Sequence, residues 1–293
     1  MRAGESLEEF LSGRSIVKSK SSGEKAGVLT LAATAEISSD FDLSRREVEI
    51  ASLSQGIIPD RYLRNSSLLS LNEQKRLLES KVLLVGLGGL GGTIAELLAR
   101  VGIGRLVVAD GDQFEENNLN RQILSSEKVL GESKTKVAFE RLTEINSAIH
   151  IDPIDRYLGE GDLDVILNGV DVAVDALDNF SDRFLLERKC SQYDIPLVHG
   201  AVGGAWGQVS VIYPRDPGLR LIYGEEHDLP ETGIEAILGN LSPTVGAVAS
   251  IQVMEVIKVL TGKGVPLRNR IIFLDLMEGQ IEVANIMDGE HDR

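Results

Sequence analysis

The sequence predicts an α/β fold in which a doubly wound, mostly parallel sheet is extended by antiparallel strands near the C-terminal end. Three observations predict it. A short apolar run at Lys81–Val85 leads into a glycine-rich turn, strand-like and helix-like segments alternate up to about residue 199, and strand-like segments then follow one another directly. The first two patterns are typical of parallel strands joined by helices, and the third is typical of antiparallel strands.

The first repeating unit spans residues 81–110. Its glycines Gly86, Gly88 and Gly91 match G-x-G-x-x-G between the apolar run and a segment with helical spacing, and "RLVVAD" at 105–110 is the next strand. Glycines at such a turn let a phosphate approach the backbone N–H groups at the start of the helix. The unit therefore predicts a Rossmann-like nucleotide site, in which Asp110 at the second strand's end accepts hydrogen bonds from a ribose.

The later elements follow the same alternation. Strands are predicted at 149–152, 172–175 and 196–199, helices at 134–146, 182–193 and 245–260, and a final strand pair in "RIIFLDLMEGQIEVANI" with its turn at Glu278 and Gly279. The last helix contains Gln252, Glu255 and Lys258. It is therefore predicted to be amphipathic and not to span a membrane.

Three parts of the chain are distinguished. Residues 1–60 show weak periodicity and are predicted to be an N-terminal extension with some local structure and unknown role. Residues 61–80 are predicted to be a lead-in helix segment, with Ser70 as N-cap and Glu73 in the capping-box position. Residues 81–293 are predicted to form the main nucleotide-binding domain.

Composition narrows the function classes. The chain of 293 residues is 43% hydrophobic, enough for a full core, and its net charge of −15 disfavours nucleic acid and anionic membranes as partners. Its one cysteine, Cys190, cannot form an internal disulfide or supply the thiolate pairs of a structural zinc site. With no secretory signal in the first residues, a reduced, cytoplasmic compartment is expected.

Polar groups after the second strand distinguish a triphosphate from a dinucleotide. The residues from Lys81 to Asp110 would be the same in an NAD-linked oxidoreductase, so they do not discriminate between the two. Asn117, Asn118 and Arg121 then follow, with Lys134 and Asp178 further on. An arginine and a lysine can stabilise the charge that develops on an attacked α-phosphate, and Asp178 is a hard oxygen ligand suited to Mg²⁺. Taken singly, the two basic residues could be surface charges and Asp178 a helix cap.

These residues resemble a known family. Residues 81 to about 287 are similar to the MoeB/ThiF/HesA adenylyltransferases, bacterial relatives of ubiquitin-activating enzymes. The matching motifs are "GLGGLG" (86–91), "DGD" (110–112), "NNLNRQ" (117–122), "GESK" (131–134), "DALDNFSDR" (175–183) and "PLVHGAVGGAWGQV" (196–209).

The resemblance implies roles for individual residues. The nucleotide-binding residues would be Gly86, Gly88, Gly89, Gly91, Asp110, Asp112, Asn117, Asn118, Arg121, Gln122, Lys134, Asp178 and Asn179. Arg121, Lys134 and Asp178 would be catalytic, with Asp178 positioning Mg²⁺ and ATP. "RYLRN" at 61–65 resembles a further family motif, and makes Arg64 the candidate arginine that completes the active site of the partner in a symmetric homodimer; its alternative is an ordinary surface arginine.

The resemblance also implies the reaction. A C-terminal glycine carboxylate of a ubiquitin-like sulfur-carrier protein, resembling MoaD or ThiS and ending in Gly-Gly, would attack the α-phosphate of ATP to give an acyl-adenylate and pyrophosphate, for molybdopterin or thiamine sulfur transfer. Alternative substrates are a small-molecule or tRNA-linked carboxylate. Alternatives of another class are an NAD-binding oxidoreductase, which the motifs at 117–122 and 175–179 disfavour, and a catalytically inactive scaffold.

The sequence departs from the family in its cysteines. Many members carry two C-x-x-C pairs that bind zinc and a cysteine before the late helix, and residues 220–248 here contain none. We therefore expect no zinc site, no enzyme thioester in that loop, and a sulfur nucleophile that arrives from outside. Packing is the favoured role for Cys190, a structural role for His199, and a solvated loop for His227.

Overall fold

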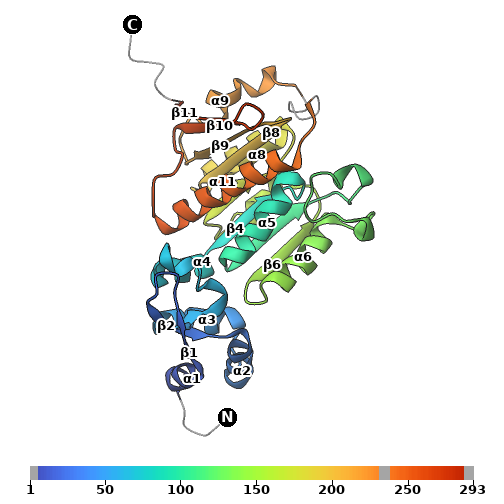
Figure 1. Cartoon of the computed structure of the whole chain (residues 1–293). Helices are drawn as coiled ribbons and strands as arrows, with labels where there is room; N and C mark the ends of the chain where they lie inside the picture. The colour runs from blue at the N-terminus through green and yellow to red at the C-terminus, as the bar shows by residue number, and fades with distance from the viewer. Residues whose placement is uncertain (1–5, 231–237, 287–293) are drawn as a thin grey trace.

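An eight-stranded sheet is the largest element of the computed structural model, which describes residues 6–230 and 238–286 (Figure 1). In spatial order the strands are β11 (Gln280–Asn285), β10 (Arg270–Asp275), β9 (Trp206–Ile212), β8 (Leu197–Gly203), β7 (Val172–Asp175), β4 (Lys81–Val85), β5 (Arg105–Asp110) and β6 (His150–Asp155). Strands β8 to β6 in this order pair in parallel, and β9, β10 and β11 add antiparallel strands. This confirms the predicted fold class.

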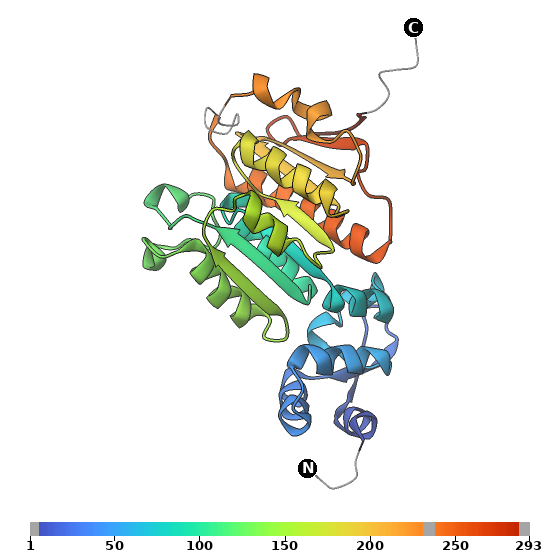
Figure 2. The same cartoon turned by 180° about the vertical axis from the view of Figure 1, so that it is seen from behind.

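Helices cover both faces of the sheet and bury its apolar side chains. One face packs against α5 (Gly89–Val101), α6 (Lys134–Ile145) and α11 (Ser242–Thr261), as Figure 1 shows. The other packs against α7 (Glu160–Ile166) and α8 (Phe180–Gln192), which lie in front in Figure 2. Strand β4 is buried from both sides, so its residues after Lys81 are all apolar.

The strand order creates a crevice beside β4. The chain proceeds from β4 to β5 on one side and returns to β7 on the other. Helix α5, which leaves β4, packs on one face, and helix α8, which leaves β7, packs on the other. Connections that diverge in this way open a crevice at the carboxyl ends of the two strands, where ligands bind in open α/β sheets.

The N-terminal residues fold into a small unit with its own sheet. It contains α1 (Leu7–Arg14), β1 (Ile16–Ser19), β2 (Lys25–Leu29), α2 (Leu31–Phe41), α3 (Arg45–Ser54) and β3 (Ile58–Pro59), and α4 (Leu71–Glu79) follows it. Its interior is apolar, with Leu11, Ile37 and Val48 fully buried. The sequence analysis expected only local structure here.

The segment that follows the N-terminal unit, up to the end of α4, contacts the sheet at the amino ends of its strands. The hydroxyl of Tyr62 accepts a hydrogen bond (2.9 Å) from Nδ2 of Asn146, which lies just before β6. The N–H of Gly104, before β5, donates to the carbonyl of Leu77 in α4 (2.9 Å). Figures 1 and 2 show the unit at one end of the molecule. It is therefore separated from the carboxyl ends of β4 and β5 by the length of those strands.

Local signals in the sequence placed several boundaries correctly. Ser70 caps α4 and Glu73 completes the capping box, as predicted. The predicted helix at 182–193 begins two residues earlier, at Phe180, and the short helix α7 was not predicted at all. Cys190 is buried, which confirms packing as its role.

The predicted amphipathic character of α11 was wrong in one respect. Gln252 and Glu255 are buried rather than exposed, because each has a partner inside the protein. Nε2 of Gln252 donates to the carbonyl of Asp175 (2.9 Å), and the carboxylate of Glu255 accepts from the N–H of Leu267 (2.9 Å). By length and composition α11 could span a membrane, but here it is a core helix packed on the sheet.

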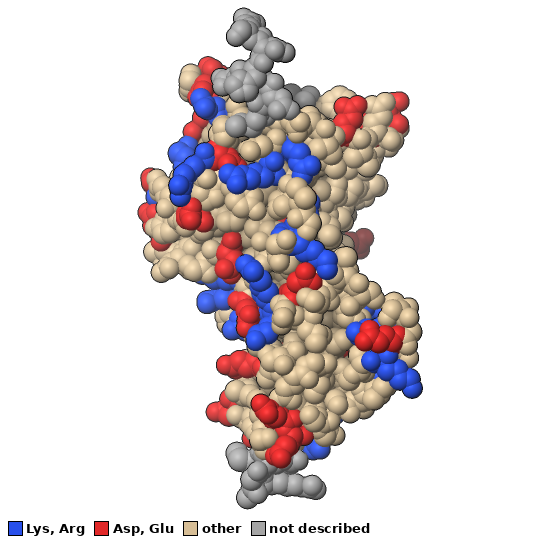
Figure 3. All heavy atoms as spheres, turned by 90° about the vertical axis from the view of Figure 1, so that its left-hand side faces the viewer, with Lys and Arg blue, Asp and Glu red and all other residues tan. Residues whose placement is uncertain are grey.

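Charged side chains are distributed over the face of the molecule shown in Figure 3. Lysine, arginine, aspartate and glutamate are interspersed there among neutral residues, from the N-terminal unit up to the antiparallel strands. Opposite charges that alternate in this way leave no broad region of a single sign on that face.

Candidate active site

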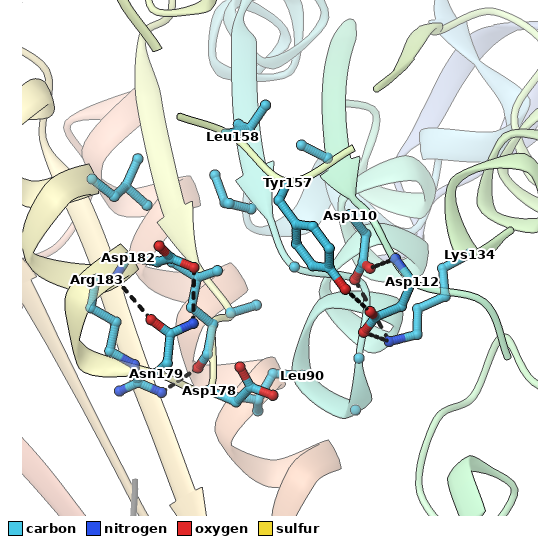
Figure 4. Close-up of a pocket in the computed structure, with 18 of the residues that line it drawn as sticks. Leu90, Asp110, Asp112, Lys134, Tyr157, Leu158, Asp178, Asn179, Asp182 and Arg183 are labelled. Atoms are coloured by element: carbon cyan, nitrogen blue, oxygen red, sulfur yellow. Dashed lines mark hydrogen bonds and ion pairs between the residues drawn. The ribbon is translucent and has the colours of Figure 1, made fainter. Parts of the chain in front are cut away.

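A cleft of about 380 Å³ lies at the carboxyl ends of β4, β5 and β7. It brings together most of the residues that the sequence analysis selected. Those that line it are Gly86, Gly88, Gly89, Asp110, Asp112, Arg121, Gln122, Lys134, Asp178 and Asn179. Gly91, Asn117, Asn118 and Arg64 do not line it. Figure 4 shows the polar groups on two walls with the cleft between them.

The glycine turn forms the floor of the cleft. It consists of glycines because side chains would not fit at these positions. Gly86 has φ +92°, and a Cβ on it would lie 2.5 Å from the carbonyl oxygen of Ala176. A Cβ on Gly91 would lie 1.8 Å from the carbonyl oxygen of Gly86. Gly91 thus allows α5 to pack directly on the turn. The first residue of α5, Gly89, lines the cleft, so the positive end of this helix faces it, as an anion-binding site requires.

One wall carries two carboxylates and a buried lysine. Nζ of Lys134 lies 2.8 Å from Oδ2 of Asp112 and 3.9 Å from Oδ2 of Asp110. Asp110 also accepts hydrogen bonds from the N–H of Leu87 (2.6 Å) and of Asp112 (2.8 Å). Burial raises the pKa of Asp110, although Lys134 and the two N–H donors oppose this shift. The lysine therefore neutralises a pair of acids at the cleft edge and lies within reach of a bound anion.

Tyr157 covers this wall and was not predicted. It follows β6, lines the cleft, and donates its hydroxyl hydrogen to Oδ1 of Asp112. Its ring lies against Gly111, where a Cβ would come within 2.8 Å of it. The bond to Asp112 raises the pKa of Tyr157 to about 12. Burial raises the pKa of Asp112, but the bonds from Lys134 and Tyr157 outweigh it and lower that pKa overall.

The opposite wall carries Asp178 and Asn179. Asn179 is the N-cap of α8: its Oδ1 accepts from the N–H of Asp182 (2.9 Å), so the cap is not Asp178. Among the described residues no hydrogen bond or ion pair engages the carboxylate of Asp178, which is exposed and lines the cleft. The structure therefore leaves it available to a cation or a ligand.

The arginine motif is placed by a 3₁₀ turn at Glu116–Asn118. Asn118 is buried, and its Oδ1 accepts from the N–H of Glu115 (3.0 Å), so it braces the turn. Nη1 of Arg121 donates to the carbonyl of Asn117 (2.8 Å) and to Oδ1 of Asn120 (2.9 Å). These bonds hold the guanidinium at the cleft, where Arg121 lies beside Gly89.

Arg64 lies far from the cleft of its own chain. It precedes α4 in the segment that contacts the amino ends of the strands, and its Nη1 donates to Oγ of Ser21 (3.1 Å). The cleft is at the carboxyl ends of the same strands. An active-site role for Arg64 therefore requires the cleft of another subunit.

A second cavity of about 570 Å³ adjoins the cleft on the side of the antiparallel strands. The two share Asp178, Asn179, Arg183 and Val202, and the second is bounded by Trp206 and Phe273 among other largely apolar surfaces. Arg183 belongs to a motif that the sequence analysis quoted, but no role was assigned to it. Its place between two cavities depends on the packing of β8 and β9, which no local pattern shows.

Comparisons with known proteins agree with this geometry. Residues 61–292 match the ThiF family. The chain is 36% identical over 230 residues to the SAMP-activating enzyme E1 of Haloferax volcanii, covering 77% of this chain and 84% of that one. It is 35% identical over 219 residues to the molybdopterin-synthase adenylyltransferase of Escherichia coli, covering 73% of this chain and 86% of that one.

Solved structures show the same fold. The chain resembles a crystal structure of E. coli MccB with MccA-N7isoASN, with a TM-score of 0.67 and 25% identity over 78% of this chain and 72% of that one. The glycine turn facing a helix N-terminus, the paired acid and lysine, and the arginine and aspartate on facing walls all lie within the matched residues. The chain belongs to the ThiF family and is an adenylyltransferase of the ubiquitin-activating-like superfamily.

Proposed function

We propose that this adenylyltransferase uses ATP and Mg²⁺ to adenylate the C-terminal glycine carboxylate of a ubiquitin-like sulfur-carrier protein, for molybdopterin or thiamine sulfur transfer. The observation that carries the proposal is the junction of two cavities at Asp178 and Arg183. One cavity has the polar walls that a triphosphate needs, and the other has the apolar lining suited to a polypeptide end. The names of the two relatives described above, a SAMP-activating enzyme and a molybdopterin-synthase adenylyltransferase, point to the same class of substrate.

The side chains of the cleft fit Mg²⁺ held jointly with a nucleotide. In residues 6–230 and 238–286, no three His, Cys, Asp or Glu side chains gather as a metal-binding group. Mg²⁺ is commonly held by one or two carboxylates together with substrate phosphates, and the free carboxylate of Asp178 suits that arrangement. The ion would supply positive charge next to the phosphates.

The chemistry then follows from charge placement. A carboxylate oxygen of the carrier attacks the α-phosphorus, the bond from that phosphorus to the oxygen of the β-phosphate breaks, and pyrophosphate leaves with the electron pair. The N-terminus of α5, Arg121 and Lys134 surround the place where negative charge develops. Removing one such donor typically costs about 10²–10³ in rate.

The surface beside the second cavity suits a protein partner. Exposed apolar side chains there include Trp206 and Phe273, which line the cavity from β9 and β10, and Met277 in the turn that follows β10. Exposed apolar groups gathered in this way commonly mark protein interaction sites. We also propose a symmetric homodimer in which Arg64 of the partner subunit completes each cleft.

Isotope exchange tests the proposed reaction. Labelled pyrophosphate should be incorporated into ATP only when a small protein ending in Gly-Gly, recovered with this chain by pull-down, is present. Arg121→Ala and Asp178→Ala should abolish the exchange, and Arg100→Ala, on the exposed side of α5, should leave it unchanged. Undiminished exchange in the first two variants would refute the assigned site. If a small carboxylic acid supports the exchange without any protein substrate, the proposal that the substrate is a carrier protein is refuted.

A further inference from the structure

A buried pair of side chains lies directly behind the loop that carries Asp178. Asp175 ends β7, His199 faces it in β8, and both are fully buried. Nδ1 of His199 lies 2.7 Å from Oδ2 of Asp175. No part of the proposed chemistry uses either residue, yet a buried carboxylate is retained only where its partners satisfy it.

The third member of this network is Tyr223, in α9 (Leu219–Tyr223). Its hydroxyl oxygen accepts from Nε2 of Gln208 (2.5 Å) and from Nη1 of Arg183 (3.2 Å). The same oxygen lies 2.9 Å from Nε2 of His199. Burial lowers the pKa of His199 and so favours the neutral imidazole, which can donate one ring N–H to Asp175.

The other end of the network fixes the peptide before Asp178. Oδ1 of Asp175 accepts from the N–H of Leu177 (2.9 Å), and Nη2 of Arg183 donates to the carbonyl of Leu177. Both polar groups of Leu177 are thus bound to side chains that also contact the network. Asp178 follows immediately, and Figure 4 shows it projecting into the cleft, near Arg183 and Asn179.

We propose that His199 and Tyr223 are positioning residues that hold Asp178 in place for the magnesium nucleotide. This inference rests on the proposed function, because it takes Asp178 as the ligand. Tyr223 orients His199 and Arg183, and His199 orients Asp175. Asp175 and Arg183 in turn bind the backbone of Leu177. Since Tyr223 also lines the second cavity, the same set of bonds joins the two cavities through the protein interior.

Equilibrium binding of a non-cleavable ATP analogue, with and without Mg²⁺, tests the inference without any carrier protein. Mg²⁺ should tighten analogue binding by the wild-type protein, and Asp178→Asn should remove that effect. Tyr223→Phe keeps the ring but loses the hydroxyl. His199→Asn keeps a polar group near the position of Nδ1 but loses the contact of Nε2 with Tyr223. Each should raise the Mg²⁺ concentration needed for half of the effect by about tenfold, as loss of residues behind a metal ligand does, with binding in the absence of Mg²⁺ unchanged.

Controls separate positioning from general damage. Tyr193→Phe removes a hydroxyl bonded to Asp164 on the far side of α8 and should keep the wild-type Mg²⁺ dependence. The double variant Tyr223→Phe with His199→Asn should lose less than the sum of the two single effects, because both substitutions break the bond between Tyr223 and His199. If His199→Asn fails to fold, Tyr223→Phe decides alone.

The outcomes are distinguishable. A wild-type protein that does not bind the analogue would remove the proposed function and this inference with it. Normal Mg²⁺ dependence in Tyr223→Phe, alongside its loss in Asp178→Asn, would overturn the inference and leave the proposed function intact.

Discussion

Lys134 and Asp112 form an ion pair of 2.8 Å at the cleft, with the lysine side chain buried and Asp110 close on its other side. Lys134→Met would leave two carboxylates facing each other without a cation. We expect it to reduce pyrophosphate exchange by about 100-fold or more and the free energy of unfolding by about 1–3 kcal/mol. Urea denaturation and exchange kinetics measure both. Lys136→Met, which removes an exposed lysine two positions away, should change neither, and equal effects in the two variants would contradict the assigned role.

Gly91→Ala tests the close packing of α5 on the glycine turn. The new Cβ would overlap the backbone carbonyl of Gly86, which has no flexible end that could move aside. We expect a loss of about 3 kcal/mol in unfolding free energy and weaker binding of the ATP analogue. Gly246→Ala in α11, where a Cβ meets nothing within 4 Å, is the matched control and should be neutral or stabilising. A Gly91→Ala protein as stable as this control would show that the turn has room to shift.

Mixing two inactive variants tests the proposed role of Arg64 across a dimer. Arg64→Ala and Asp178→Ala should each abolish exchange. When the two are mixed and allowed to exchange subunits, each mixed dimer has one cleft with both residues intact. About a quarter of wild-type activity should then return, because half of the dimers are mixed and each has one intact cleft of two. If no activity returns although mixed dimers are shown to form, Arg64 of one subunit does not act in the cleft of the other.

Glu49 should make stability depend on pH. It is buried in α3, with one oxygen 3.3 Å from Nε of Arg61, and burial raises its pKa from 4.5 to about 7. Between these values the unfolded chain loses the proton while the folded one keeps it, so stability falls as pH rises from about 4.5 to 7. Glu49→Gln should therefore gain stability relative to wild type over this range, by about 3 kcal/mol, and no further above it.

A carboxylate of the same helix provides the opposite control. Hydrogen bonds from Ser44 lower the pKa of Glu47, so the wild-type protein should gain stability relative to Glu47→Gln as pH rises through the acid range. Thermal melts of the three proteins, from well below pH 4 up to pH 8, measure both trends. A pH-independent difference between wild type and Glu49→Gln would show that the pKa of this carboxyl is the same in the folded and unfolded chains.

Features carried by neighbouring residues could be predicted from the sequence. The glycine turn, the strand before it and the capping box at Ser70 each depend on residues within one or two turns of chain, and the structure confirms all three. The walls of the cleft were predictable in part, because Asp110 and Asp178 follow buried strands, and the carboxyl ends of neighbouring parallel strands meet.

Features that depend on distant contacts could not. Nothing near Tyr157 indicates that its ring folds back over Gly111. The network of His199, Tyr223 and Arg183 joins residues from β8, α9 and α8, so its members share no spacing. The N-terminal unit was missed for another reason, since its third strand is only two residues long and shows no period of its own.

Helix α11 shows what a long apolar segment reports. It is long and apolar enough to cross a bilayer, but 56% of its most apolar stretch is buried in the protein, and Gln252 satisfies a carbonyl 77 residues away in sequence. A high hydropathy thus indicates that much of a helix is shielded from water. It leaves open whether lipid or other parts of the protein shield it. The polar residues within such a segment decide the question, because each needs a partner that only another part of the chain can offer.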